Sequence, residues 1–385
     1  MGEVGLTYPG LSGKTKEDFG HGDARFVTYM NVYSNAVANP DGVEAIEKDN
    51  RQHEVRNGDV FFTGSSETPD EVGLSSVWLG NSTDTYLNSF CFGYRPSKQL
   101  DSLFLASSLR SPQMRSRMIL LAQGISRFNI SKTQVMQLPL CFPSLPEQRR
   151  IGEFFTTLDN LIAAAERQEA LLRQKKQAYL QLMFPQESET EPQLRFSGFN
   201  DAWKRIALRS VLKINEERNT ASEFGFDKTI SVSTMRFKPE GNGAAHASLE
   251  TYRVLRVGDV AFEGNRHKEY PYGHVVINDI GDGLMSSRFR SFRPTQLICV
   301  PFWKYLLQNR YIMTPLLLRS TMRGTLMNEL VVDDFLKQRT PMPSLQEQLE
   351  IGDFFETLDC LIENAEGRIA QLRKMKSSYL QKLFV

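Results

Sequence analysis

Two segments of the chain carry a regular recurrence of apolar residues that predicts long helices. Apolar side chains return at intervals of three and four residues over more than four heptads in each segment, which is typical of a coiled coil. The predicted seam residues are Ile151, Phe155, Leu158, Ile162, Leu172 and Tyr179 in the first segment, and Ile351, Phe355, Leu358, Ile362, Leu372 and Tyr379 in the second. Lys176 and Lys376 interrupt the two seams, and such polar seam residues can fix register.

Both helices have recognisable starts. Ser144 and Ser344 each stand three residues before a glutamate, Glu147 and Glu347, which is the spacing of a capping box. Pro146 falls in the first turn, where its missing N–H costs nothing. A helix of this length spans about 60 Å and cannot bury its apolar stripe alone. We therefore expect the two helices to pack against each other.

A second apolar column lies beside each seam, near the start of the helix. Phe154 and Leu161 form it in the first segment, and Phe354 and Leu361 form it in the second. A two-helix seam does not need these residues. They either pack against the globular domain of their own half or form a docking surface for another subunit.

Short β-type runs alternate with Gly, Asn and Asp turns in the regions outside the helices. Examples of the runs are Arg25–Tyr29, Asp59–Phe62, Tyr252–Leu255, Asp259–Phe262 and Gly273–Ile277, and short helical stretches follow near Leu100–Leu109 and Trp303–Arg310. The fold class that this pattern predicts is α+β, with a mixed sheet and short helices in each domain. The predicted order is a domain over 1–143, a helix over 144–184, an acidic linker over 185–192, a domain over 193–343 and a helix over 344–385.

The chain repeats itself at an offset of 200 residues. Leu145–Phe184 and Leu345–Phe384 share 22 identities in 40 positions, and Arg56–Phe62 matches Arg256–Phe262 at the same offset. Between these matches the two halves diverge strongly, which indicates a duplicated scaffold that carries two different variable surfaces. The opening of the second half, Gln193–Trp203, has no counterpart in the first half, so about 10 to 20 residues of the repeat are expected to be absent there.

Composition and charge set limits on location and chemistry. With 41% hydrophobic and 24% charged residues, and no apolar run near the roughly 18 residues that cross a bilayer, the chain is expected to be cytoplasmic and not bound to a membrane. The four cysteines lie far apart and predict neither disulfides nor a metal site. The net charge is +1, the sum of −4 over residues 1–192 and +5 over residues 193–385. This balance neither predicts nor excludes nucleic-acid binding.

The motifs of the obvious enzyme classes are missing from the sequence, so no catalytic residue is predicted. Gly13-Lys14-Thr15 resembles the end of a phosphate-binding loop, but Tyr8 stands where its first glycine belongs. No lysine has Asp or Glu two positions earlier, as a restriction-type nuclease site requires, and no NPPY- or DPPY-type tetrapeptide of an adenine methyltransferase occurs. A solitary nuclease remains a weak alternative.

The duplicated PSLxEQ helix entry, the IGxFFxTLDxLI helix and the PxLRFxGFxxxW opening of the second half closely resemble the specificity subunits of type I restriction–modification systems. The resemblance covers nearly the whole chain. It implies two target-recognition domains held apart on two antiparallel helices, each domain reading one half of a bipartite, asymmetric site in double-stranded DNA. It also implies partners: two modification (adenine N6-methyltransferase) subunits, to which restriction subunits are added. S-adenosylmethionine, ATP and Mg²⁺ would belong to those partners, and this chain would hold no cofactor.

Two other readings of the chain stay open. It could be the recognition subunit of a related two-subunit methyltransferase–nuclease, or a coiled-coil adaptor without a DNA-binding role.

Base recognition needs forked donors on loops or strands that enter a groove. The candidates are Lys14, Lys16, Ser65, Ser66 and Arg127 in the first domain, and Arg236, Lys238, Arg266, His267, Lys268, Arg288, Arg290 and Arg323 in the second. Asn265–Lys268 follows its strand at the same place in the repeat as the Ser65 loop. For any single member of this set an ordinary solvated side chain is the competing interpretation.

Overall fold

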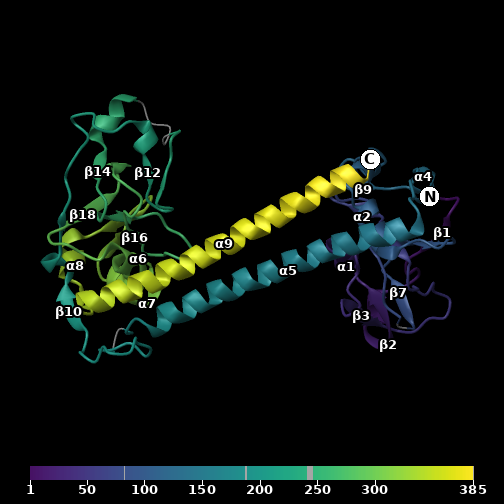
Figure 1. Ribbon diagram of the computed structural model, residues 1–385, viewed down its shortest axis with the longest axis horizontal. Coiled ribbons are helices and arrows are strands. Elements are labelled where there is room, and N and C mark those ends of the chain that lie inside the picture. The colour runs from purple at the N-terminus through teal and green to yellow at the C-terminus, as the bar shows by residue number, and fades with distance from the viewer. Residues whose placement is uncertain (82, 187–188, 241–245, 385) are drawn as a thin grey trace. The chain divides into compact units, whose positions relative to one another are not determined.

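A computed structural model describes residues 1–81, 83–186, 189–240 and 246–384 (Figure 1). The chain divides into two compact units. The first contains Met1–Arg167 together with Glu366–Val385, and the second contains Gln168–Ala365. Each unit thus combines one globular domain with a part of each long helix. Residues 187–188 of the predicted linker and residue 385 of the predicted second helix lie outside the described residues.

The first unit is a mixed α+β domain followed by a long helix. A four-stranded sheet has the order β1-β8-β4-β6, a three-stranded sheet has the order β3-β2-β7 with β2 and β7 parallel, and β5 pairs with β9. The bounds are β1 Gly5–Pro9, β2 Phe19–Val27, α1 Tyr29–Ser34, β3 Val43–Ile46, β4 Val60–Thr63, β5 Ser65–Ser66, β6 Ser75–Val77, β7 Thr85–Leu87, β8 Cys91–Pro96, α2 Ser102–Leu109, α3 Pro112–Leu120, β9 Phe128–Asn129, α4 Lys132–Gln137 and α5 Leu145–Leu182.

The second unit repeats this plan. Its four-stranded sheet has the order β11-β18-β15-β16, and the pairs β14-β17, β12-β13, β19-β20 and β10-β21 surround it. The bounds are β10 Lys204–Ala207, β11 Leu212–Ile214, β12 Ile230–Ser231, β13 Arg236–Phe237, β14 Arg253–Leu255, β15 Val260–Glu263, β16 His274–Ile277, β17 Gly283–Met285, β18 Arg290–Pro294, α6 Val300–Gln308, α7 Arg310–Leu318, β19 Thr321–Arg323, β20 Asn328–Leu330, α8 Val332–Lys337, β21 Arg339–Met342 and α9 Leu345–Leu383.

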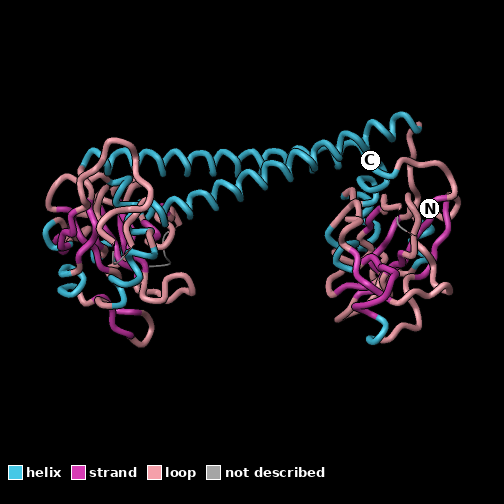
Figure 2. The backbone as a smooth tube through the Cα atoms, turned by 90° about the horizontal axis from the view of Figure 1, so that it is seen from below, coloured by secondary structure: helices cyan, strands magenta, loops and turns pink. Residues whose placement is uncertain are grey.

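The two four-stranded sheets have the same register. Val60 faces Tyr94 across β4 and β8, and Val260 faces Phe292 across β15 and β18. In each unit the strands lie to one side of the long helical segments (Figure 2). The 200-residue offset found in the sequence therefore relates β4 to β15, and their partner strands β8 and β18, offset by 198 residues, pair with them in the same way.

The repeated Gly-Asp-Val turn is held by a buried carboxylate. Asp59 accepts hydrogen bonds from the backbone N–H of Arg56, from the Tyr8 hydroxyl at 2.6 Å and from both sides of the Arg95 guanidinium at 2.7 and 2.8 Å. Gly58 precedes it with φ +86°, a conformation that favours glycine. The hydrogen bonds to Asp59 raise the pKa of Arg95.

The second unit builds the same network from equivalent residues. Asp259 accepts from the Arg256 backbone N–H and from the Arg293 guanidinium, and Glu217 takes a further contact from Arg293 at 2.6 Å. A buried carboxylate is tolerated only when its lone pairs are satisfied, and here three or more donors satisfy it. This requirement explains why the turn is repeated while the surrounding sequence diverges.

The long helices pack against each other within each unit. In the first unit Asp159 of α5 pairs with Lys376 of α9, and Glu166 pairs with Arg373 at 2.7 Å. In the second unit Lys176 pairs with Asp359. In the second unit Tyr179 also contacts Phe354. In both units the residue numbers rise along one helix as they fall along the other, so both helix pairs are antiparallel. The interrupting lysines of the predicted seams are thus partners of aspartates on the facing helix.

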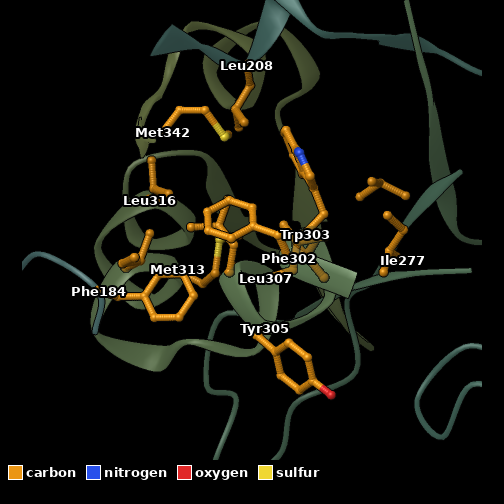
Figure 3. Close-up of a cluster of buried hydrophobic side chains, with 14 of the residues drawn as sticks. Phe184, Leu208, Ile277, Phe302, Trp303, Tyr305, Leu307, Met313, Leu316 and Met342 are labelled. Carbon is orange, nitrogen blue, oxygen red and sulfur yellow. The ribbon is translucent and has the colours of Figure 1, made fainter. Parts of the chain in front are cut away.

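Each domain is fixed to the helices by an aromatic cluster. In the second unit Phe184, at the end of the first long helix, stacks on Phe302 at 5.6 Å and lies 6.2 Å from Phe355 of α9. Figure 3 shows Phe184 among the buried side chains of α6 and α7. Gly352 permits the close approach, since a Cβ there would lie 3.0 Å from the backbone nitrogen of Phe302.

The first unit has the matching cluster. Phe384 lies 5.8 Å from Phe155 of α5 and 5.5 Å from Phe104 of α2, and the Gln113 amide donates to the carbonyl of Gln381 at 2.9 Å. The first domain therefore packs on the C-terminal helix.

The structure differs from the sequence-based expectations at the end of one strand and at the two capping boxes. The first strand ends at Val27, and Tyr29 starts α1 because Thr28 caps that helix through the N–H of Asn31. The capping box is only half formed at Ser344, whose hydroxyl accepts from the Glu347 N–H, because the Glu347 carboxylate binds elsewhere.

At the start of α5 the box is also incomplete. The N–H of Glu147 is bonded to the carbonyl oxygen of Ser144 at 3.0 Å, which is a backbone turn and needs no serine hydroxyl.

We predict that Asp59→Asn lowers the free energy of unfolding of the first unit by about 3 kcal/mol, because an amide leaves the buried end of Arg95 without its counter-charge. Asp59 is 1% exposed. Chemical denaturation with hydrogen exchange of the β4 and β8 amides measures the effect. Asp84→Asn, which alters the more exposed pair with Lys48, is the matched control and should change stability by less than about 0.5 kcal/mol. Equal effects of the two substitutions would refute the central role of the Asp59 network.

Candidate DNA-recognition surface

A loop and a hairpin lie side by side at one end of the main sheet of the second unit. The loop Asn265–Lys268 follows β15, and the hairpin is β19–β20. The Asn328 N–H donates to the carbonyl of Gly264 at 2.8 Å, and the Arg266 guanidinium donates to the carbonyl of Gly324. We call this the loop–hairpin surface of the second unit. It brings together four of the predicted residues, all exposed: Arg266, His267, Lys268 and Arg323.

The first unit has a loop–hairpin surface of different chemistry. Its loop position is β5, which pairs with β9, and the N–H of Ile130 donates to the carbonyl of Gly64 at 3.1 Å. Ser65 and Ser66 are buried here, at 9% and 7% exposure, so the expectation that they lie in an exposed loop was wrong. Strand pairing buries them, and the Ser66 hydroxyl is used on Glu71 at 2.8 Å.

Arg127 remains exposed beside these serines. It lies at the turn of the hairpin that contains β9, with its guanidinium 5.5 Å from the ring of Phe90, which is itself more than half exposed. The first loop–hairpin surface therefore presents one cation and an aromatic ring, where the second presents several cations.

Arg288 and Arg290 lie near the same end of the second sheet. Arg290 starts β18 and faces Phe262, the residue before the last of β15, and both arginines are exposed. Arg236 and Lys238 lie on and just after β13, whose Phe237 packs in one apolar cluster with Phe289. The cationic residues of the second unit are thus carried on neighbouring elements around the end of one sheet.

The basic segment at Lys14 is not a free loop. The Lys14 ammonium lies 3.3 Å from Asp49 and 3.5 Å from Asp18, and its side chain is only 10% exposed. The positive charge of Lys14 is therefore paired with neighbouring carboxylates. Lys16 starts a short 3-10 turn and is exposed.

Buried Glu263 and half-buried His274 lie below the second surface, and Glu263 was not found from the sequence. Glu263 ends β15 and faces His274 of β16, and within the described part of the chain Glu263 Oε2 and His274 Nε2 have no hydrogen-bond partner. Burial raises the pKa of Glu263 and lowers the pKa of His274 to about 4. The only signal in the sequence is that Glu263 replaces Thr63 at the equivalent strand end, which periodicity alone does not detect.

Unsatisfied buried polar atoms are rare and need an explanation. An acceptor at the edge of a basic surface is suited to the amino group of cytosine or adenine. The position of Glu263, two residues before Asn265, fits that chemistry.

Apolar residues at the hairpin tips were also missed. Ile125 is 96% exposed in the first unit, and Leu326 is 85% exposed in the second. Exposed apolar side chains beside cations can contact thymine methyl groups or wedge between base steps. The pattern assigned them to no element because each stands alone in a turn.

The second apolar column of the helices is partly used within the units. Phe154 packs edge-to-face on Tyr379 at 4.9 Å, and Phe354 packs on Tyr179 at 5.1 Å. Both phenylalanines thus extend the seam, and Phe354 also packs on Phe196 of its own half at 5.8 Å, as the domain-packing interpretation expected. Leu161 and Leu361 are 40% and 46% exposed and Phe154 is 36% exposed, so these members of the column are accessible for docking.

Among the described residues no group of three or more His, Cys, Asp or Glu could hold a metal ion. All four cysteines are free, and Cys91 and Cys299 are buried. In the part of the chain that the structure describes, no helix combines the length and apolar character needed to cross a membrane.

We predict that acid destabilises the second unit partly through His274. Its folded pKa of about 4 lies below the ordinary 6.5, so the unfolded chain binds the proton first as pH falls. The stabilisation of wild type relative to His274→Gln should be full above pH about 6.5 and shrink by about 3 kcal/mol by pH 4. Denaturation at several pH values measures this difference. His53→Gln, an exposed histidine of the first unit, should give no such trend, and a pH-independent effect of His274→Gln would contradict the assignment.

Comparisons with known proteins agree with the repeat. The family model described as the type I restriction modification DNA specificity domain matches residues 14–174 and again 200–374. The type I restriction enzyme MjaVIII specificity subunit of Methanocaldococcus jannaschii is 23% identical over 356 residues, covering 87% of this chain and 80% of the relative. The putative MjaX specificity subunit of the same organism is 20% identical, covering 88% of this chain and 80% of the relative.

Solved structures share the fold. The S subunit of a type I restriction–modification system from M. genitalium superposes with a TM-score of 0.58 at 14% identity, covering 100% of this chain and 94% of that one. The HsdS subunit from Thermoanaerobacter tengcongensis gives 0.50 at 16% identity, covering 100% and 95%. At such identities these structures show the fold alone. Because the family model matches most of the chain in two copies, the chain belongs to the type I restriction–modification DNA specificity family, as a specificity subunit with two specificity domains.

Proposed function

We propose that this chain recognises a bipartite, asymmetric DNA site, with one half-site bound by the loop–hairpin surface of each unit. The observation that carries the proposal is that two sheets of the same order and register carry different side chains at the same end. A shared scaffold with different surface residues is what two readers of unlike half-sites require. The duplication supports a pseudo-two-fold arrangement, with the antiparallel helices acting as the spacer between the two domains.

The chemistry of the two surfaces suits different roles. In the second unit Arg266, Lys268 and Arg323 can contact phosphates or guanine, with Glu263 as a buried acceptor beneath them. In the first unit Arg127 is the exposed cation, and Phe90 and Ile125 offer apolar contact. The first half-site should therefore depend more on shape and apolar contact than the second.

The chain acts through partner subunits in this proposal. Two modification subunits would dock on the helices, with Leu161 and Leu361 as exposed apolar contacts, and restriction subunits would join them. S-adenosylmethionine, ATP and Mg²⁺ would be bound by those partners, and the chain itself would be non-catalytic. A related two-subunit methyltransferase–nuclease would use the same DNA contacts but lack the separate restriction subunit, so the identity of the co-purifying subunits distinguishes the two.

We predict that exchanging residues 1–143 for the corresponding domain of another family member changes one half of the recognised site and leaves the other half and the spacer unchanged. The measurement is sequencing of modified adenines after co-expression with the modification gene in a methylation-free host. The unaltered chain should give a bipartite asymmetric motif with a fixed gap. A change in both half-sites would refute the model of one reader per domain, and unmethylated DNA from an intact complex would refute DNA recognition.

We predict that Lys268→Ala and Arg323→Ala each weaken DNA binding and lower the slope of log K against log salt by about 1, because each removes one phosphate contact. Fluorescence anisotropy with a duplex carrying the mapped site measures both quantities. Arg209→Ala is the matched control. Arg209 is exposed but lies shortly before β11, which pairs with the far end of β18, and its removal should leave the slope unchanged. An equal loss for the control would mean that binding is not localised to the loop–hairpin surface.

A further inference from the structure

A single segment covers the base of the long helix in the second unit. The Arg195 guanidinium makes two hydrogen bonds to the Glu347 carboxylate, at 2.6 and 2.9 Å, and the Trp203 indole N–H donates to the same carboxylate at 3.2 Å. Glu347 is 1% exposed as a result. One buried carboxylate thus holds two residues of the segment that lie eight positions apart.

The segment also completes an aromatic cluster and a sheet. Trp203 packs edge-to-face on Phe184 at 6.0 Å and on Phe302 at 6.1 Å, and Phe196 packs on Phe354 at 5.8 Å. After the tryptophan the chain enters β10, which pairs antiparallel with β21. The segment therefore contributes a charge, two aromatic rings and a strand.

The first unit has residues equivalent to those that contact the segment in the second unit. Glu147 stands where Glu347 stands in the repeat, and Phe384 and Phe104 occupy the places of Phe184 and Phe302. The residues Pro139–Phe142 occupy the place of β21, and within the described residues they are paired with no strand.

The two units share one backbone contact beside this position. The N-terminal amine of Met1 donates to the carbonyl of Leu138 at 2.8 Å, as the Leu208 N–H donates to the carbonyl of Gln338 at 2.9 Å. Met1 thus holds the place of Leu208, the residue directly after β10.

The corresponding surface of the first unit is a groove of about 320 Å³. Its lining includes Phe104, Met114, Phe142, Glu147, Ile151 and Phe384. Glu147 is exposed, and within the described part of the chain its carboxylate has no hydrogen-bond or ion-pair partner.

Exposure differs between the units at the positions that the segment covers. Cys141 is exposed where Pro341 is buried, and Ile151 is half-buried where Ile351 is 2% exposed. Other seam positions differ less, as Phe155 and Phe355 are both fully buried. The uncovered area is therefore confined to the groove.

We propose that the groove of the first unit is a binding site for an extended polypeptide segment with the chemistry of Gln193–Ala207. The segment carries an arginine and a tryptophan eight residues apart, both directed to Glu147, and then a strand that pairs with Pro139–Phe142. The charge complementarity and the occupied equivalent groove in the same molecule identify this occupant. The site is separate from the loop–hairpin surface and does not depend on DNA recognition.

Cys141 supplies a direct test on the full chain. A synthetic peptide of residues Gln193–Ala207 is added, and the alkylation rates of Cys141 and Cys360 by a maleimide are followed by mass spectrometry. Both thiols are exposed, and Cys360 lies in the second unit. We expect saturating peptide to slow the alkylation of Cys141 at least tenfold and to leave Cys360 unchanged, because Cys141 takes the place of the strand residue Pro341.

Matched variants test the carboxylate. Glu147→Gln should weaken peptide binding by about 10- to 100-fold, the worth of charge-assisted hydrogen bonds, and Glu153→Gln on the same helix should not. Peptides with Arg195→Ala or Trp203→Ala should bind correspondingly weakly.

Three results would overturn the proposal. The first is an alkylation rate of Cys141 that the peptide does not change. The second is equal slowing of that alkylation by the Trp203→Ala peptide. The third is an affinity for the peptide that Glu147→Gln does not change. Protection that grows with chain concentration without peptide, together with a dimer in light scattering, would assign the groove to contact between copies of the chain instead.

Discussion

The fold of each unit depends on the junction where a domain meets the start of one long helix and the end of the other. A helix with one apolar stripe gains most of its stability from packing, since its intrinsic propensity is small. Here the stripe is closed by aromatic rings: Phe155 with Phe384 in the first unit, and Phe355 with Phe184 in the second. The helices and the domains therefore stabilise each other at this junction.

Polar pairs fix the alignment of the helices at this junction. Lys176 with Asp359 and Lys376 with Asp159 are the same pair in two copies, displaced by 200 residues. Ion pairs of this kind add little net stability, but a mismatched register would leave a lysine facing an apolar seam. These ion pairs instead favour one register of the two helices over the others. Such a register holds the rings of Phe154 and Phe354 against tyrosines of the facing helix.

Repetition and periodicity in the sequence were sufficient to predict the regular elements of the fold. The two helices, the main strands and the shared turn at Asp59 and Asp259 follow from apolar spacing and from the 200-residue offset. The capping box failed because Glu347 has a stronger partner in Arg195, which lies 152 residues away and leaves no local signal. Long-range partners of this kind decide where a side chain goes and are invisible to local pattern.

The sequence predicted the candidate residues for DNA contact only as a group, and could not show which of them are exposed. The sequence marked the positions after β4 and β15 as equivalent, and the structure places both beside a hairpin. It could not show that strand pairing buries Ser65 and Ser66, or that Lys14 is held by Asp49 and Asp18, because both depend on tertiary contacts. Exposed cations such as Lys268 and Arg323 were identified because solvated charge needs no partner.

The division between scaffold and surface has a physical cause in the buried networks. Asp59 and Asp259 tie a turn, a strand and an arginine together, so a change at any of these positions leaves a buried charge unpaired. The adjoining strand ends differ between the units: Thr63 is buried and hydrogen-bonded to the backbone of Glu71 and Leu74, and Glu263 occupies the equivalent place in the second unit. Beyond these strand ends, loop residues such as Arg266 and Lys268 are exposed, so substitution there costs the fold little and changes the chemistry of the surface. Two unlike surfaces can therefore diverge on one duplicated scaffold without loss of the packing that holds it.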